Sequence, residues 1–297
     1  MSNQKKTSNP TQVLYRNQNV EGVNIFYREA GSPQRPTIVL LHGYPSSSHM
    51  FRDLIPKLAG NYHVIAADMP GFGYSDAPSK DKFDYNFAHL AEVMDKFLDA
   101  IGVNNYSIYV QDYGAPVGFR LFTMHPQKIN AIVSQNGNAY EEGLGEFWGA
   151  SLVPFWKNRN PETEAKVREL VTLGATKFQY FTGVGNEEHI SPDGYQFDQR
   201  LLDRPGIDDI QVELFYDYRK NIELYPVWHE ALRKAQPPLL AVWGKGDAIF
   251  VPAGAEAFRR DVTNAEIHYV DSGHFALEEE SAAIAEYILD FLSKHVG

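Results

Sequence analysis

The sequence predicts an α/β protein: a mostly parallel β-sheet wrapped by helices, with a helical block inserted in the second half of the chain. Two observations lead to this prediction. Short apolar runs alternate with segments of helical periodicity, and short connections join them, which is typical of parallel sheets. The alternation stops after residue 137 and resumes with the apolar run at 237–244.

The first half of the chain contains most of the predicted strands. Polarity alternates on either side of "NQNVEG", in residues 13–16 and 23–29, which indicates a β-hairpin. Buried strands are predicted from continuous apolar runs at 37–43, 62–68, 106–112 and 129–135. Helices are predicted at 50–59, 87–101 and 114–125. Between the second buried strand and the next helix, residues 68–78 are rich in Gly and Pro and form a loop.

The second half divides into a helical block and a return of the strand pattern. Residues 138–228 contain helical segments, many aromatic residues and no convincing buried strand. Strands follow at 237–244 and 265–270, with helices at 253–261 and 281–295. We therefore predict a flexible arm at 1–12, an α/β core at 13–137 and 229–297, and a helical cap at 138–228.

Composition excludes several classes of function. The 297 residues carry a net charge of −11, and no run of Lys or Arg is longer than two residues, as in Lys5-Lys6 and Arg259-Arg260, so neither nucleic acid nor a membrane is a predicted partner. Without cysteine, the chain has no disulfide or thiolate metal site. No stretch of 18 apolar residues and no signal peptide are evident, so we expect a cytoplasmic location. The sequence leaves the oligomeric state open.

Polar residues follow four of the predicted strands. In open α/β sheets, ligands bind at the carboxyl ends of the strands. Three of these ends carry an acid, an acid and a histidine, which is the order nucleophile, acid, base found in hydrolases. The four positions are His42-Gly43-Tyr44-Pro45, Asp112-Tyr113-Gly114, Asp247 and His274.

These motifs together resemble the α/β-hydrolase fold with a helical cap, in the branch with an aspartate nucleophile. That branch contains the epoxide hydrolases and the haloalkane dehalogenases. The resemblance implies that Asp112, Asp247 and His274 are catalytic, and that the backbone amides of Tyr44 and Tyr113 form an oxyanion hole. The matching stretches are "HGYP" (42–45), "DMPGFGYSDAP" (68–78), "VQDYG" (110–114), "GKGD" (244–247) and "GHFALEE" (273–279).

A carboxylate suits this position because it can displace a leaving group directly at an sp³ carbon. It is ionised at neutral pH and needs no prior deprotonation. The product would be an alkyl ester of Asp112. Water activated by His274 would then attack the ester carbonyl, while Asp247 orients the imidazole.

Alternatives exist for two of these roles. Asp112 could instead be a helix N-cap, and Ser75 in "GYSDA" could be a nucleophile, although it does not directly follow a buried strand. Asp271, three residues before His274, competes with Asp247 as the acid. The stretch "QNGN" after the strand at 129–135 contains no acid, which favours Asp247.

Two leaving groups remain possible. Dehalogenases use two N–H donors for the halide, and the corresponding positions here are Tyr113 and Tyr44, so Trp148 or Trp156 would have to supply a donor. An epoxide oxygen needs a proton donor, for which a tyrosine hydroxyl is suited. By resemblance, Tyr218 in "FYDYRKN" and Tyr180 in "KFQYFTG" are the candidates.

The sequence thus predicts hydrolysis of an epoxide to a diol through an ester on Asp112. Haloalkane dehalogenation is the alternative, and a ligand receptor on a hydrolase fold is an alternative from outside the enzymes. The substrates would be a small apolar organic molecule and water. We expect an apolar pocket lined in part by Trp148, Trp156 and Phe178, and neither a cofactor nor a metal.

Overall fold

A single eight-stranded sheet forms the centre of the protein. The computed structural model describes residues 11–296, so residues 1–10 of the predicted arm lie outside the described part. In the sheet, the strands follow the order β1-β2-β4-β3-β5-β6-β7-β8. Their bounds are β1 (Leu14–Val20), β2 (Val23–Ala30), β3 (Thr37–Leu41), β4 (His63–Ala67), β5 (Tyr106–Val110), β6 (Ile129–Gln135), β7 (Leu239–Gly244) and β8 (Glu266–Val270).

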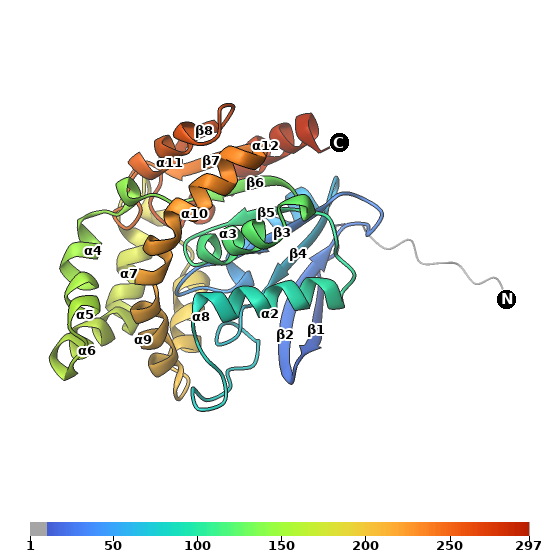
Figure 1. Cartoon of the computed structure of the whole chain (residues 1–297). Helices are drawn as coiled ribbons and strands as arrows, with labels where there is room; N and C mark the ends of the chain where they lie inside the picture. Colours follow the sequence, from blue (N-terminus) through green and yellow to red (C-terminus); the bar gives the residue numbers. More distant parts are fainter. Residues whose placement is uncertain (1–10, 297) are drawn as a thin grey trace.

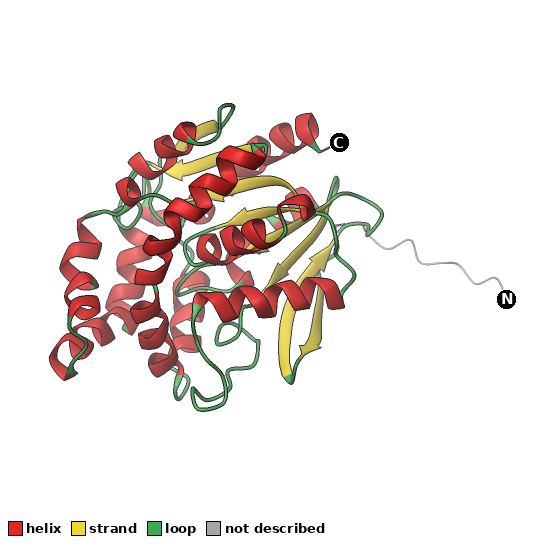
Figure 2. Cartoon of the chain, in the orientation of Figure 1, coloured by secondary structure: helices red, strands yellow, loops and turns green. Residues whose placement is uncertain are grey.

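The six strands from β4 to β8 in the sheet order form a continuous parallel sheet, and β2 pairs antiparallel with both β1 and β4. This confirms the predicted α/β architecture. Helices cover both faces of the sheet (Figure 2). Those that flank it are α1 (Ile55–Leu58), α2 (Phe87–Ala100), α3 (Gly114–Met124), α10 (Arg219–Ala235), α11 (Ala253–Ala257) and α12 (Leu277–His295).

The chain between β6 and α10 forms six further α-helices, which we call the connecting helices. They gather beyond one end of the sheet, where the parallel strands terminate (Figure 1). Their bounds are α4 (Glu146–Ser151), α5 (Val153–Lys157), α6 (Pro161–Arg168), α7 (Leu173–Phe181), α8 (Pro192–Leu202) and α9 (Ile207–Asp217). Short 3₁₀ helices lie at Ser48–Phe51, Pro126–Lys128, Glu141–Gly143, Glu169–Val171, Glu187–His189 and Phe258–Arg260.

The buried strands supply two hydrophobic clusters, one on each face of the sheet. In β3, Val39 and Leu41 belong to one cluster, whereas Ile38 and Leu40 belong to the other, as the two-residue period of a strand requires. The first cluster packs against α2, α3 and α10, and the second packs against α1 and α12. Because both faces are covered, these strands are apolar throughout rather than alternating.

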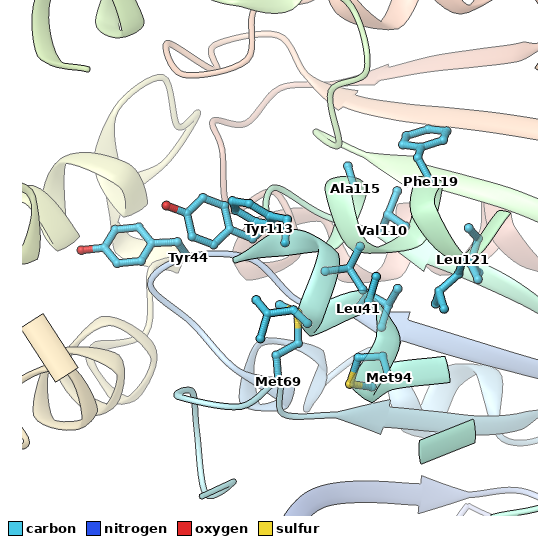
Figure 3. Close-up of a cluster of buried hydrophobic side chains, with 14 of the residues drawn as sticks. Leu41, Tyr44, Met69, Met94, Val110, Tyr113, Ala115, Phe119 and Leu121 are labelled. Carbon is cyan, nitrogen blue, oxygen red and sulfur yellow. The ribbon is translucent and has the colours of Figure 1, made fainter. Parts of the chain in front are cut away.

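Figure 3 shows part of the first cluster, with Leu41 and Val110 beneath α3. The rings of Tyr44 and Tyr113 lie beside each other at one end of it, with centroids 5.8 Å apart. The cluster therefore reaches the end of the sheet at which polar residues were predicted.

Two predicted boundaries differ from the observed ones. The predicted turn "NQNVEG" is mostly strand, because β1 continues to Val20 and only Glu21 and Gly22 turn, both with positive φ (51° and 90°). Such a two-residue turn matches the twist of the hairpin. The predicted helix 50–59 is a 3₁₀ turn followed by the short α1, while α10 continues through residue 228, where the core was predicted to resume.

Among residues 11–296, no helix is both long enough and apolar enough to cross a bilayer.

Candidate active site

Asp112 lies in a sharp turn between β5 and α3. Its φ of 46° is left-handed, a conformation that a non-glycine residue adopts only when its surroundings enforce it. The enforcement comes from close packing of α3 on the sheet. A Cβ on Gly114 would lie 2.1 Å from the carbonyl oxygen of Leu41, and one on Gly118 would lie 2.4 Å from Val110. Glycine at both positions lets the helix begin immediately after Asp112.

Backbone N–H groups hold the carboxylate of Asp112. The amide of Tyr44 donates to Oδ1 at 2.6 Å, and the amide of Tyr113 also stabilises the charged form. Burial nevertheless raises the pKa of Asp112 to about 6, against the lowering effects of His274 and these two amides. Both predicted oxyanion donors thus bond the carboxylate of the predicted nucleophile.

His274 lies between the two aspartates. Its Nδ1 is 2.8 Å from Oδ2 of Asp247, and its Nε2 is 3.8 Å from Oδ2 of Asp112. Burial lowers the pKa of His274, but the charge of Asp247 and its hydrogen bond outweigh this, so the pKa lies above the ordinary value. The three residues predicted from the strand ends therefore come together in space.

Asp247 accepts several hydrogen bonds besides that of His274. Its Oδ1 accepts from the amides of Ile249 and Phe250 at 2.8 and 3.1 Å. Its Oδ2 accepts from the side-chain amide of Asn136 at 2.6 Å. Asn136 follows β6 with a φ of 47°, and the sequence analysis did not assign it a role. The only signal for it was its position at a strand end.

Asp271 and Ser75, the alternative acid and the alternative nucleophile, both have interaction partners of their own. The side chain of Asp271 is 78% exposed and forms an ion pair with Lys245 at 2.7 Å. The hydroxyl of Ser75 is buried, donates to the carbonyl of Asp68 and accepts from the amide of Phe26. Neither residue is placed to act on a ligand at Asp112.

An apolar cavity of about 250 Å³ opens above Asp112. Trp148 and Phe178 line it, as predicted, whereas Trp156 is not among its lining residues. Gln179 also lines it and is largely buried. The lining residues are Tyr44, Asp112, Tyr113, Phe147, Trp148, Leu152, Leu170, Ala175, Phe178, Gln179, Phe215 and Ile249.

Neither tryptophan offers a free N–H to this cavity. The indole of Trp148 donates to the carbonyl of Ile249 at 2.8 Å, and that of Trp156 donates to the carbonyl of Phe215 at 2.7 Å. The expectation that one of them could serve a halide is therefore not supported by the geometry.

Two tyrosine hydroxyls lie near Asp112. The hydroxyls of Tyr113 and Tyr218 are both buried. That of Tyr113 has no hydrogen-bond partner among the described residues, whereas that of Tyr218 bonds to the hydroxyl of Tyr225. Burial raises the pKa of both groups, and the charge of Asp112 raises it further, so both are within electrostatic reach of the nucleophile. The ring of Tyr218 lies 5.9 Å from that of Tyr113 and 4.5 Å from that of Trp148.

Tyr180 corrects the prediction made from the resemblance. Its hydroxyl donates to Oδ2 of Asp198 at 2.6 Å, its ring stacks on Phe275, and it does not line the cavity. The neighbouring Phe178 and Gln179 face the cavity instead. We therefore withdraw Tyr180 as a leaving-group donor.

No group of three or more His, Cys, Asp or Glu side chains within residues 11–296 could hold a metal ion.

Comparison with known proteins identifies the family. The alpha/beta hydrolase fold family matches residues 36–281. An uncharacterized hydrolase of Saccharomyces cerevisiae is 46% identical over 93% of this chain and 95% of its own length. A haloalkane dehalogenase of Bradyrhizobium diazoefficiens is 24% identical over 96% of each chain.

One solved structure, the epoxide hydrolase CorEH, superimposes with a TM-score of 0.77 at 21% identity, covering 95% of this chain and 99% of that one. At this identity the likeness concerns the fold alone. The fold and the buried Asp-His-Asp arrangement define a hydrolase. The chain belongs to the alpha/beta hydrolase fold family, and its relatives include a haloalkane dehalogenase and an epoxide hydrolase.

Proposed function

We propose that this enzyme hydrolyses an epoxide to a vicinal diol through an ester on Asp112. One contrast carries the proposal. Two buried tyrosine hydroxyls lie near Asp112: that of Tyr113 has no partner among the described residues, and that of Tyr218 bonds to another hydroxyl, that of Tyr225. By contrast, both indole N–H groups of Trp148 and Trp156 are bonded to carbonyls. The site thus offers hydroxyl donors of the kind that an epoxide oxygen needs, and none of the indole donors that a halide needs.

In the first step, Asp112 attacks an epoxide carbon. Its Oδ1 accepts the Tyr44 amide, so Oδ2 is the oxygen free to attack. The new bond joins Oδ2 to carbon, the carbon–oxygen bond of the ring breaks, and the oxygen leaves as an alkoxide. The alkoxide takes a proton from Tyr218, and the tyrosinate recovers it later in the cycle.

The burial of these hydroxyls also favours this assignment energetically. A buried polar group without a partner, such as the hydroxyl of Tyr113, destabilises a protein by about 1–3 kcal/mol. An epoxide oxygen would accept a hydrogen bond from such a group, most strongly once it becomes an alkoxide. The interaction is therefore stronger in the transition state than in the ground state, as catalysis requires.

In the second step, water hydrolyses the ester. His274 takes a proton from the water as its oxygen bonds to Cγ of Asp112, and Asp247 stabilises the imidazolium. The negative charge then develops on Oδ1, which already accepts the amide of Tyr44, while the amide of Tyr113 also bonds this carboxyl group. Collapse breaks the bond between Cγ and Oδ2, and the diol leaves with Oδ2 and the proton from His274. The second water proton, now on the carboxyl group of Asp112, returns to the tyrosinate of Tyr218 and restores the ionised nucleophile.

The cavity restricts the substrate. At about 250 Å³ it lies below the usual range for drug-sized ligands, and its lining is mostly aromatic and aliphatic. A small apolar epoxide, with water as co-substrate, fits these properties.

Dehalogenation is the second candidate, because a haloalkane dehalogenase is similar over nearly the whole chain. The same Asp112 ester would form, with halide as the leaving group. The receptor alternative would not need the hydrogen-bonded Asp247–His274 pair, and nothing in the site favours it.

The deciding experiment is the intact mass of the His274→Ala protein after incubation with epoxides and, separately, with bromoalkanes. Without the base, the ester should accumulate. We expect a gain equal to the whole epoxide mass, and no gain in the His274→Ala, Asp112→Asn double variant. A gain of only an alkyl group from bromoalkanes would favour dehalogenation, and no gain with either panel would contradict the proposal.

A further inference from the structure

Gln111 directly precedes Asp112 in the chain, and its side chain reaches His274, the proposed general base. Its side chain is fully buried, and its Nε2 lies 2.9 Å from Nε2 of His274. This is the imidazole nitrogen that faces away from Asp247 and that must accept the proton from water. No other described side chain lies within hydrogen-bond distance of that nitrogen.

The other end of the same amide is unused. Oε1 of Gln111 is buried and has no hydrogen-bond partner among the described residues. It lies beside Asp112, because a Cβ on Gly43 would be 2.3 Å from Oε1 of Gln111 and 2.6 Å from Oδ1 of Asp112. Glycine at position 43 thus leaves room for an acceptor and for the nucleophile's carboxyl group side by side.

We propose that Gln111 orients the hydrolytic water that cleaves the ester on Asp112. This inference rests on the proposed ester mechanism but not on the identity of the leaving group. Water hydrolyses the ester on Asp112 in the same way whether the substrate is an epoxide or a haloalkane.

The hydrogen-bonding capacity of the groups supports this arrangement. Neutral Nε2 of His274 has one lone pair, so the water must displace the resting contact with Gln111 to be deprotonated. The water then donates one proton to Nε2, and its second O–H can donate to Oε1 of Gln111. Its lone pairs are left for Cγ of Asp112.

No proton is lost or gained by Gln111 in this step. The water oxygen bonds to Cγ, and one water proton moves to His274. The other proton remains on the water oxygen and forms a hydrogen bond with Oε1 of Gln111. Gln111 therefore acts only in ester hydrolysis. Ester formation needs Oδ2 of Asp112 and a leaving-group donor, neither of which Gln111 contacts.

The test measures the two steps separately, by rapid quench and intact mass, in two variants. Gln111→Met preserves the length of the side chain and removes both polar atoms. We expect its ester hydrolysis to slow by about tenfold or more, with ester formation within about twofold of wild type, so that the ester accumulates during turnover. Gln111→Glu keeps an acceptor and should hydrolyse the ester within about fivefold of wild type.

The Glu variant has a second signature. A carboxylate next to His274 stabilises the imidazolium, so the pH midpoint of ester hydrolysis should move upward.

Gln211→Met is the matched control, because Gln211 is also a fully buried glutamine but lies on α9 and does not line the cavity. Thermal unfolding of all variants checks that the fold is retained.

Two outcomes would overturn the inference. In the first, Gln111→Met hydrolyses the ester at the wild-type rate, and in the second, Gln111→Glu is as slow as Gln111→Met. If the ester forms from bromoalkanes instead of epoxides, the proposed leaving group is wrong. The rates of ester formation and ester hydrolysis would still test whether Gln111 orients the water. Failure of every variant, wild type included, to form an ester would refute both.

Discussion

The pKa values of Asp112 and His274 each depend on the charge of the other residue. Burial raises the pKa of Asp112 to about 6, while the imidazolium of His274 opposes the rise. Conversely, Asp247 and Asp112 raise the pKa of His274. Forming the ester removes the charge of Asp112, and with it one of the two carboxylates that hold the proton on His274. The imidazole should therefore become a neutral base at the stage that requires one.

This coupling predicts different pH dependences for the two steps. Ester formation needs ionised Asp112 and should rise with pH through a midpoint of about 6. Ester hydrolysis needs neutral His274, so it should also rise with pH. Its midpoint should lie below the pKa of His274 in the free enzyme, because the ester has no charge. Rapid-quench rates compared with an NMR titration of the free enzyme check this, and a midpoint at or above that of free His274 would contradict it.

The tryptophans predict the response to halide ions. Because the indoles of Trp148 and Trp156 are bonded to carbonyls, bromide should show no saturable inhibition of epoxide turnover at constant ionic strength. Sodium sulfate at matched ionic strength is the control. Saturable inhibition by millimolar bromide would show a halide site and favour the dehalogenase alternative.

At the scale of elements, the site depends on how closely α3 packs on β3 and β5. The helix starts two residues after Asp112, and its first residue, Gly114, lies against the backbone of Leu41. This packing holds Asp112 in its left-handed conformation and keeps the amide of Tyr113 near the carboxylate. A small residue at 114 is thus a requirement of the element rather than of the chemistry.

We predict that Gly114→Ala destabilises the protein by about 1–3 kcal/mol or more, because its Cβ would meet the Leu41 carbonyl oxygen at 2.1 Å. The matched control is Gly149→Ala in α4, where a Cβ would meet no atom within 4 Å and alanine favours the helix. Urea unfolding measures both free energies. Equal stability of the two variants would contradict this account of the turn.

At the scale of the whole molecule, a buried polar network joins the connecting helices to the core. Asp198 on α8 accepts from Tyr180 on α7, and the charge of Glu278 on α12 acts on it. Glu278 in turn forms a two-pronged ion pair with Arg52 at 2.9 and 2.7 Å. Burial raises the pKa of Asp198 to about 7, against hydrogen bonds from Tyr180 and Ser46 and the charge of Arg52.

This network predicts a pH-dependent stability. In the unfolded chain Asp198 loses its proton near pH 4, whereas in the folded protein it keeps the proton up to about pH 7. The folded state therefore binds more protons in this window, and the free energy of unfolding falls as pH rises from about 4 to 7.

Asp198→Asn removes this titration, so its free energy of unfolding should fall less between pH 5 and pH 8 than that of wild type. Urea unfolding at the two pH values measures the difference. The same slope in both proteins would mean that Asp198 does not titrate as described.

The failure of the Tyr180 assignment has a simple physical cause. Successive residues of an α-helix point about 100° apart, so a shift of one position changes which side chain faces the cavity. The resemblance located the right stretch of α7, but only the packing against α8 and Phe275 shows that Phe178 and Gln179 face inward. Trp156 was likewise in the right helical region, but its indole turns to the carbonyl of Phe215.

The sequence by itself determined the fold and the positions of Asp112, Asp247 and His274. Apolar runs of strand length specify buried parallel strands, and the carboxyl ends of parallel strands meet at one edge of the sheet. Only the tertiary structure decided which donors are free. The hydrogen bond from Trp148 to Ile249, and the lack of any partner for Oε1 of Gln111 within residues 11–296, depend on residues distant in the chain. Such pairing is a property of three-dimensional packing, which residue spacing does not encode.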